Sequence, residues 1–95
     1  MIFVINNLKY NTDNMELISD KCKYTFDVLI FDVSIKYYGK NVKLWKSKKD
    51  NWLLTYDRDI CTCCGIALSS KNAAELLLKY DITAYEKIFG EFEEA

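Results

Sequence analysis

The sequence predicts a small α+β domain, in which an antiparallel sheet of about four or five strands is covered on one side by two C-terminal helices. The chain has 95 residues, of which 51% are hydrophobic, and this suffices for one packed core and a single domain spanning residues 1–95. Short stretches rich in β-branched and aromatic residues come first. From Ser69 onward the apolar spacing changes to a helical period, so strands precede helices.

The first strands are expected at the N-terminal end. Met1 to Ile5 is short, apolar and β-branched, Asn6-Asn7 is a turn pair, and Leu8 to Tyr10 forms the return strand. After a polar turn cluster, Met15 to Lys23 fits either a strand or one helical turn, because its apolar residues are adjacent, and we favour the strand.

A two-sided apolar stretch follows, from Phe26 to Ile35. Apolar residues stand at Phe26, Val28 and Ile30, and then move to the opposite parity. This pattern favours one strand that is buried on both faces or bent by a bulge.

The clearest element is a hairpin within residues 39–58. Val42 to Lys46 and Trp52 to Tyr56 are both rich in aromatic or branched residues, and the polar stretch from Ser47 to Asn51 joins them, with Asp50-Asn51 expected at the tip. Because side chains alternate across a strand, Trp52, Leu54 and Tyr56 share one face, which we expect to belong to the core.

Two helices complete the chain. Ser69 or Ser70 is the N-cap candidate of the first, whose apolar stripe is formed by Ala73, Leu76, Leu77 and Tyr80. Asp81 or Thr83 caps the second helix, which Gly90 ends, and an acidic tail follows.

Composition excludes several chemistries. The chain has no His, which excludes Ser-His-Asp and Cys-His catalysis and every His-containing zinc site. Its four cysteines, Cys22, Cys61, Cys63 and Cys64, lack the usual paired spacing of a zinc site, so we expect reduced thiols, no metal and no cofactor. No apolar run approaches the length of a membrane span and no signal peptide is evident, so a cytoplasmic protein that does not act at membranes is expected.

The charges are unevenly spread along the chain. Residues 36–56 hold six Lys against Asp50, a net of +5, whereas residues 57–95 hold four basic against eight acidic residues, a net of −4. The Lys-rich hairpin with its aromatic residues could bind single-stranded nucleic acid, through Lys43, Trp45, Lys46, Lys48 and Lys49. The competing interpretation is structural, because Lys on an edge strand prevents pairing with other sheets and aromatic residues usually belong to the core. We favour this structural interpretation over nucleic-acid binding.

Acidic residues near the C-terminal end offer a different binding surface. We take Asp57, Asp59, Glu91, Glu93 and Glu94 as candidates for contact with a basic groove on a partner protein. The alternative is a solvated tail that only keeps the protein soluble. No spacing among these residues predicts a catalytic carboxylate pair.

Three stretches resemble a family of small, mostly uncharacterised proteins from phages and mobile elements of low-GC Gram-positive bacteria. Lys43 to Leu54 is similar to that family's LY-x-TKKGNWFL hairpin, and Leu68 to Leu77 with Tyr85 to Ala95 resembles its LS-x-EEA-x-ELL … Y-x-x-IFG-x-x-EEA ending. Lys9 to Ile18 resembles its YDT … AELI opening. The chain departs from the pattern at Asp50, which replaces the turn Gly, and at Asp57 to Gly65, which replaces a Gly-rich loop.

The resemblance implies a mobile-element accessory protein, a class in which inhibitors of host defence, including anti-CRISPR proteins, are frequent. We therefore expect a non-enzymatic inhibitor that binds a host protein, most concretely a Cas effector complex, and occludes its basic nucleic-acid channel. The alternative is a small single-stranded nucleic-acid-binding or regulatory protein that uses the Lys-rich hairpin. The oligomeric state is left open.

Overall fold

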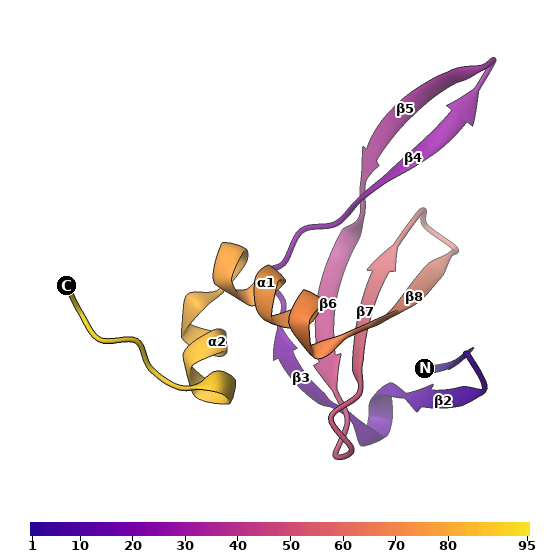
Figure 1. Cartoon of the computed structure of the whole chain (residues 1–95). Coiled ribbons are helices and arrows are strands. Elements are labelled where there is room, and N and C mark those ends of the chain that lie inside the picture. The colour runs from indigo at the N-terminus through magenta and orange to yellow at the C-terminus, as the bar shows by residue number, and fades with distance from the viewer.

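The computed structural model describes every residue from 1 to 95, and its elements confirm the α+β class. Strands come first and helices last (Figure 1). In chain order the elements are β1 (Ile2–Ile5), β2 (Leu8–Asn11), the 3-10 helix η1 (Thr12–Asn14), β3 (Glu16–Ser19), β4 (Thr25–Ile30), β5 (Val33–Tyr38), β6 (Lys40–Lys46), β7 (Trp52–Asp57), β8 (Cys63–Leu68), α1 (Ser70–Tyr80) and α2 (Ile82–Phe89).

The eight strands form three separate antiparallel sheets instead of one. The main sheet has four strands in the order β3-β6-β7-β8, and the pairs β1-β2 and β4-β5 each form a two-stranded sheet. The expected β1-β2 and β6-β7 hairpins and the strand at β3 are all confirmed. Asn6 and Asn7 both adopt the left-handed φ, at 52° and 65°, that a tight two-residue turn between twisted strands requires.

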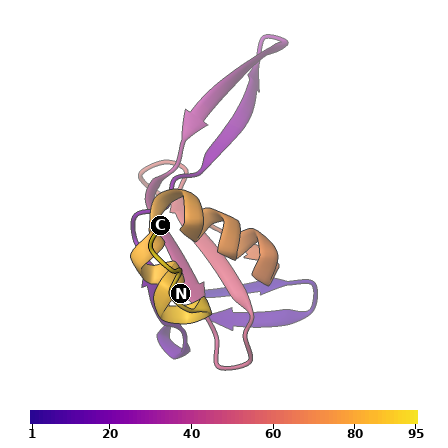
Figure 2. The same cartoon turned by 60° about the vertical axis from the view of Figure 1, so that its left-hand side comes forward.

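The main sheet is covered on both faces. Helices α1 and α2 lie on one face, as predicted, and the β1-β2 hairpin lies behind the other (Figure 2). The ring of Phe3 fills the space over Gly65 of β8, where a Cβ atom would come within 2.8 Å of it. Gly is therefore the residue at position 65 that lets the N-terminal hairpin approach the sheet closely.

Burial centres on β7. On the helix side Trp52, Leu54 and Tyr56 pack with Ala73 and Leu77, as the alternation predicts. Leu53 and Thr55, on the opposite face, are buried as well, so the expectation of a single core face was incomplete. A central strand with a layer on each face buries every side chain, so its sequence does not alternate between apolar and polar residues.

The prediction of one strand from Phe26 to Ile35 is wrong. The chain reverses at Phe31-Asp32, whose φ values of 48° and 60° make a two-residue turn between β4 and β5. The parity switch that indicated a doubly buried strand is the result of this turn, since residues on either side of a two-residue loop face the same way. The hairpin projects away from the main sheet (Figure 1).

The helix caps follow the sequence prediction. The Ser69 Oγ accepts a hydrogen bond from the backbone N–H of Asn72 at 3.1 Å, and the Asp81 carboxylate accepts one from Ala84 at 3.2 Å. Gly90 ends α2 with φ 109°. Neither helix is long and apolar enough to cross a membrane.

Candidate functional site

The acidic candidates divide into two groups. Asp57 ends β7, where it accepts a hydrogen bond from Asn41 Nδ2 at 2.7 Å, and Asp59 lies in the β7-β8 loop. Glu91, Glu93 and Glu94 lie in the exposed tail after α2. Figure 1 shows the tail and the β7-β8 loop at opposite sides of the molecule. The structure therefore does not bring the five carboxylates together.

The tail is fixed at one point by an aromatic stack. The ring of Phe92 lies over the ring of Tyr85 in α2, with centroids 5.3 Å apart and planes 7° apart. Tyr85 in turn packs on Phe89, 4.9 Å away. Because Phe92 stands between Glu91 and Glu93, this contact keeps the start of the acidic tail close to α2, and the tail then leads away from the helices (Figure 1).

Asp59 is held in its ionised form. The backbone N–H of Cys61 donates to Asp59 Oδ1 at 2.9 Å, and this bond, with a hydrogen bond from Thr62, lowers the pKa of the Asp59 carboxyl below its ordinary value. The fully exposed loop therefore presents a negative charge at every physiological pH.

The candidate nucleic-acid-binding residues of the β6-β7 hairpin are also separated, since some lie on either face of the main sheet and others lie in the β6-β7 turn at its end. Lys46 lies on the helix side, where its Nζ is 2.9 Å from Asp50 Oδ1. Trp45 faces the opposite side, and its Nε1–H donates to Thr55 Oγ1 at 2.9 Å. Lys43 has the parity of Trp45, and only Lys48 and Lys49 reach the tip of the turn. Trp45 is half-buried and hydrogen-bonded, so it is a poor platform for stacking a base.

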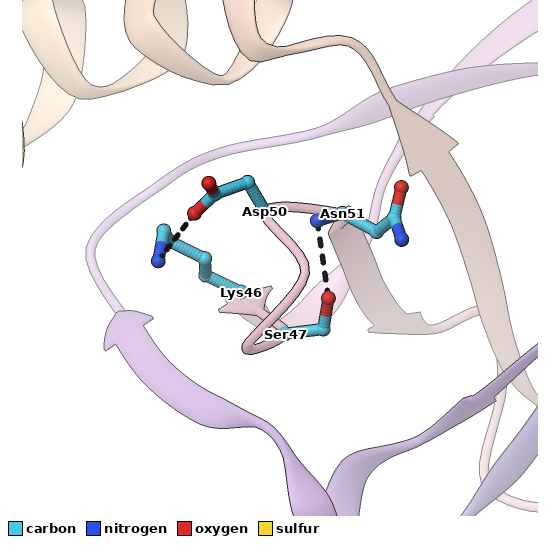
Figure 3. Close-up of polar contacts among 4 residues, drawn as sticks. All are labelled: Lys46, Ser47, Asp50 and Asn51. Carbon is cyan, nitrogen blue, oxygen red and sulfur yellow. Dashed lines mark hydrogen bonds and ion pairs between the residues drawn. The ribbon is translucent and has the colours of Figure 1, made fainter.

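The β6-β7 turn is internally braced (Figure 3). The Ser47 hydroxyl accepts a hydrogen bond from the N–H of Asn51 at 3.1 Å, and the Lys46–Asp50 ion pair spans the same turn. Asp50 has φ 62°, in the left-handed region that Gly adopts without steric cost.

A groove lies beside this turn. It has a volume of about 940 Å³ and is formed by β2, η1 and the start of β3 on one side and the β6-β7 turn on the other. Its lining includes Lys9, Asp13 and Glu16 on the first side and Lys48 and Lys49 on the second. The groove is thus mixed in charge, with a small positive excess.

The cysteines do not form a site in this structure. Cys22 is buried in the core cluster, Cys61 is exposed, and all four thiols are free. Burial raises the pKa of Cys22 and of Cys63, so both remain protonated near neutral pH and are poor nucleophiles. No three His, Cys, Asp or Glu side chains gather where they could hold a metal ion.

Sequence reasoning missed one surface, which is the β4-β5 hairpin, called the arm below (Thr25–Tyr38). It exposes a run of large apolar side chains, among them Leu29, Phe31 and Val33, with Phe31 at 96% exposure. The signal in the sequence was the shift of apolar residues from even to odd positions across Phe31-Asp32.

Comparison of this chain with family models, with curated proteins and with solved structures finds no match.

Proposed function

We propose that this protein is a non-enzymatic inhibitor from a phage or mobile element that binds a host protein, most concretely an anti-CRISPR inhibitor that blocks the nucleic-acid channel of a Cas effector. The observation that carries the proposal is the anchored acidic tail. Phe92 fixes the tail that carries Glu91, Glu93 and Glu94 to α2 at one point, so three exposed carboxylates are displayed from one end of a folded scaffold.

The contact would be electrostatic. A channel that binds nucleic acid is lined with Lys and Arg, and closely spaced carboxylates can occupy the positions of phosphates. The stack of Phe92 on Tyr85 lowers the entropic cost of ordering the tail when it binds. The overall net charge is only −1, so the tail acts as a local contact, and the rest of the domain obstructs the channel by its bulk.

The test is a pull-down of tagged protein from a host carrying defence systems, with and without nuclease treatment. Retention of a nuclease complex after nucleic acid has been removed supports the proposal. Retention that depends on nucleic acid contradicts it.

Charge-reversal variants locate the surface, since the structure separates the two acidic groups. Changing Glu91, Glu93 and Glu94 to Lys should abolish most binding, whereas Asp57→Lys with Asp59→Lys should have a smaller effect. A matched control reverses three exposed acids elsewhere, Asp13, Asp20 and Glu75. Equal losses in the tail variant and this control would mean that only net charge matters, and would remove the tail from the proposal.

A second candidate function is single-stranded nucleic-acid binding, favoured by the Lys side chains along the groove at the β6-β7 turn. Here Lys48→Ala with Lys49→Ala should reduce the salt dependence of binding by about one unit of slope for each lost phosphate contact. Binding that these changes leave unaltered would eliminate this candidate.

A further inference from the structure

The two faces of the arm differ sharply. The two-residue turn sets the register Phe26↔Tyr37, Val28↔Ile35 and Ile30↔Val33, and residues directly opposite each other share a face. One face of the arm therefore consists of six apolar or aromatic side chains. The other face carries the cross-strand pair of opposite charges Asp27↔Lys36, together with Thr25, Leu29, Ser34 and Tyr38.

The apolar face begins in the core and ends in solvent. At the base, the ring of Phe26 lies 5.6 Å from that of Tyr56 and 6.0 Å from that of Tyr37, and the Arg58 guanidinium covers it at 5.5 Å. Farther out, Ile35 is 39% exposed and Val33 59%. The hydrophobic core thus continues as an uncovered strip along the arm.

A two-stranded hairpin is at best marginally stable in water and gains stability when a further layer covers its apolar face. Neither strand of the arm has a second strand neighbour, and the apolar face has no charged side chain of its own to discourage association, since the Arg58 guanidinium lies only over Phe26 at its base. Each strand of the arm has six residues, and the hairpin projects from the body of the protein (Figure 1). A layer that covers its apolar face must therefore come from another molecule.

The size of the strip fits a second copy of the same strip. With about 200 Å² for a fully exposed apolar or aromatic side chain, the exposed members of this face (Ile30, Val33, Ile35 and Tyr37), together with Phe31 in the turn at its outer end, leave on the order of 500 Å² uncovered. Two such strips facing each other bury on the order of 1,000 Å², the lower limit for a specific interface. An uncharged strip is also complementary to itself, because no like charges meet across a twofold axis.

We propose that the protein forms a twofold dimer in which the apolar faces of two arms pack against each other. The two hairpins then form a small sandwich about 10 Å thick, with both Asp27↔Lys36 faces turned to water. In an antiparallel arrangement, Phe31 at the tip of one arm covers the base of the other. The dimer leaves the acidic tail free, and it does not depend on the inhibitor function proposed above.

The experiment measures molar mass by sedimentation equilibrium between about 1 μM and 1 mM protein, for wild type and two matched Lys variants. Val33→Lys places a charge on the apolar face, and Leu29→Lys places the same charge on the opposite face of the same hairpin. Both positions are exposed, at 59% and 70%, so neither substitution should prevent folding, and circular dichroism checks this.

We expect wild type to dimerise, Val33→Lys to raise the dissociation constant at least about tenfold, and Leu29→Lys to change it less than about threefold. A wild-type protein that stays monomeric to 1 mM would overturn the proposal. So would a dimer that Val33→Lys leaves intact, or one that both variants weaken equally, since association would then not use the apolar face.

Discussion

The hairpins β4-β5 and β6-β7 have similar residue compositions but different surroundings in the fold. Both are antiparallel pairs of strands with six or seven residues, and both are rich in branched and aromatic residues. β6-β7 has a strand on either edge and a layer on either face, and five successive residues, Trp52 to Tyr56, are buried. β4-β5 has neither, and every residue of β5 is exposed.

The difference shows that the local residue pattern determines whether a segment forms a strand, whereas the neighbouring strands and layers determine how far that strand is buried. Hydrophobic stabilisation grows with the apolar area removed from water, at roughly 25 cal/mol per Å². The same Leu or Ile side chain therefore contributes much in β7 and little in the arm. The two hairpins should accordingly respond very differently to the same substitution.

The largest contrast is expected from removing one Leu side chain in each hairpin. Leu53 is 0% exposed and Leu29 is 70% exposed. Leu53→Ala should lower the free energy of unfolding by about 2 to 5 kcal/mol, because it leaves a cavity in the sheet centre. Leu29→Ala should change it by less than about 0.5 kcal/mol. Urea unfolding of both variants checks this, and equal losses would mean that the arm belongs to the core.

Phe26 marks the junction between the two regions. It is half-buried between Tyr37, Tyr56 and Arg58, so Phe26→Ala should cost about 1 to 3 kcal/mol, between the two Leu variants. Tyr38→Ala, at a position that is 71% exposed in the same arm, is the matched control and should be nearly neutral. If both changes are neutral in urea unfolding, the arm is not anchored through Phe26.

On the core side, Asp81 makes stability depend on pH. It caps α2 and accepts a hydrogen bond from Ser19 Oγ at 2.6 Å. The Ser19 bond first, and then the Ala84 N–H and the charges of Lys21 and Lys87, lower the pKa of the Asp81 carboxyl. Since the folded-state pKa lies below the unfolded one, this stabilisation is present above about pH 4 and is lost as pH falls through the folded-state pKa.

Asp81→Asn keeps a capping oxygen and removes the charge. The variant should be less stable than wild type at pH 7, and the difference should shrink below about pH 4, as thermal midpoints across pH 2 to 7 would show. The same Asp-to-Asn change at Asp27, which is exposed on the arm, is the matched control for the chemistry of the substitution. A constant difference for Asp81→Asn over the whole range would contradict the assignment.

The smallest effect is expected at the tip of the arm. Phe31 and Asp32 both have left-handed φ values, which cost a bulky residue such as Phe more than Asn or Gly. Phe31→Asn with Asp32→Gly supplies the preferred turn pair and should stabilise the arm by about 0.5 to 1 kcal/mol. Slower amide hydrogen exchange in β4 and β5, with β6 and β7 unchanged, is the expected observation for the monomer, measured at a concentration too low for the arms to associate. Faster exchange would contradict the turn assignment.

Most elements could be predicted because their signals are local. The Asn6-Asn7 turn, the Ser69 and Asp81 caps and the Gly90 stop each depend on a residue and its near neighbours. The arm was mispredicted because Phe31-Asp32 is not a usual turn pair, although the parity shift across it recorded the reversal. The candidate acidic site was chosen from charge alone, and charge along the chain does not tell which residues meet in space.

The α+β class, the succession of strands before helices, and the helix caps all follow from the amino-acid sequence, because backbone propensity and periodicity act over a few residues. Tertiary structure decided three things. It placed the β1-β2 hairpin over Gly65, moved Asp57 and Asp59 away from the acidic tail, and left one face of the arm uncovered. Each of these depends on packing between segments distant in the chain, and no local pattern encodes which surfaces will find a partner.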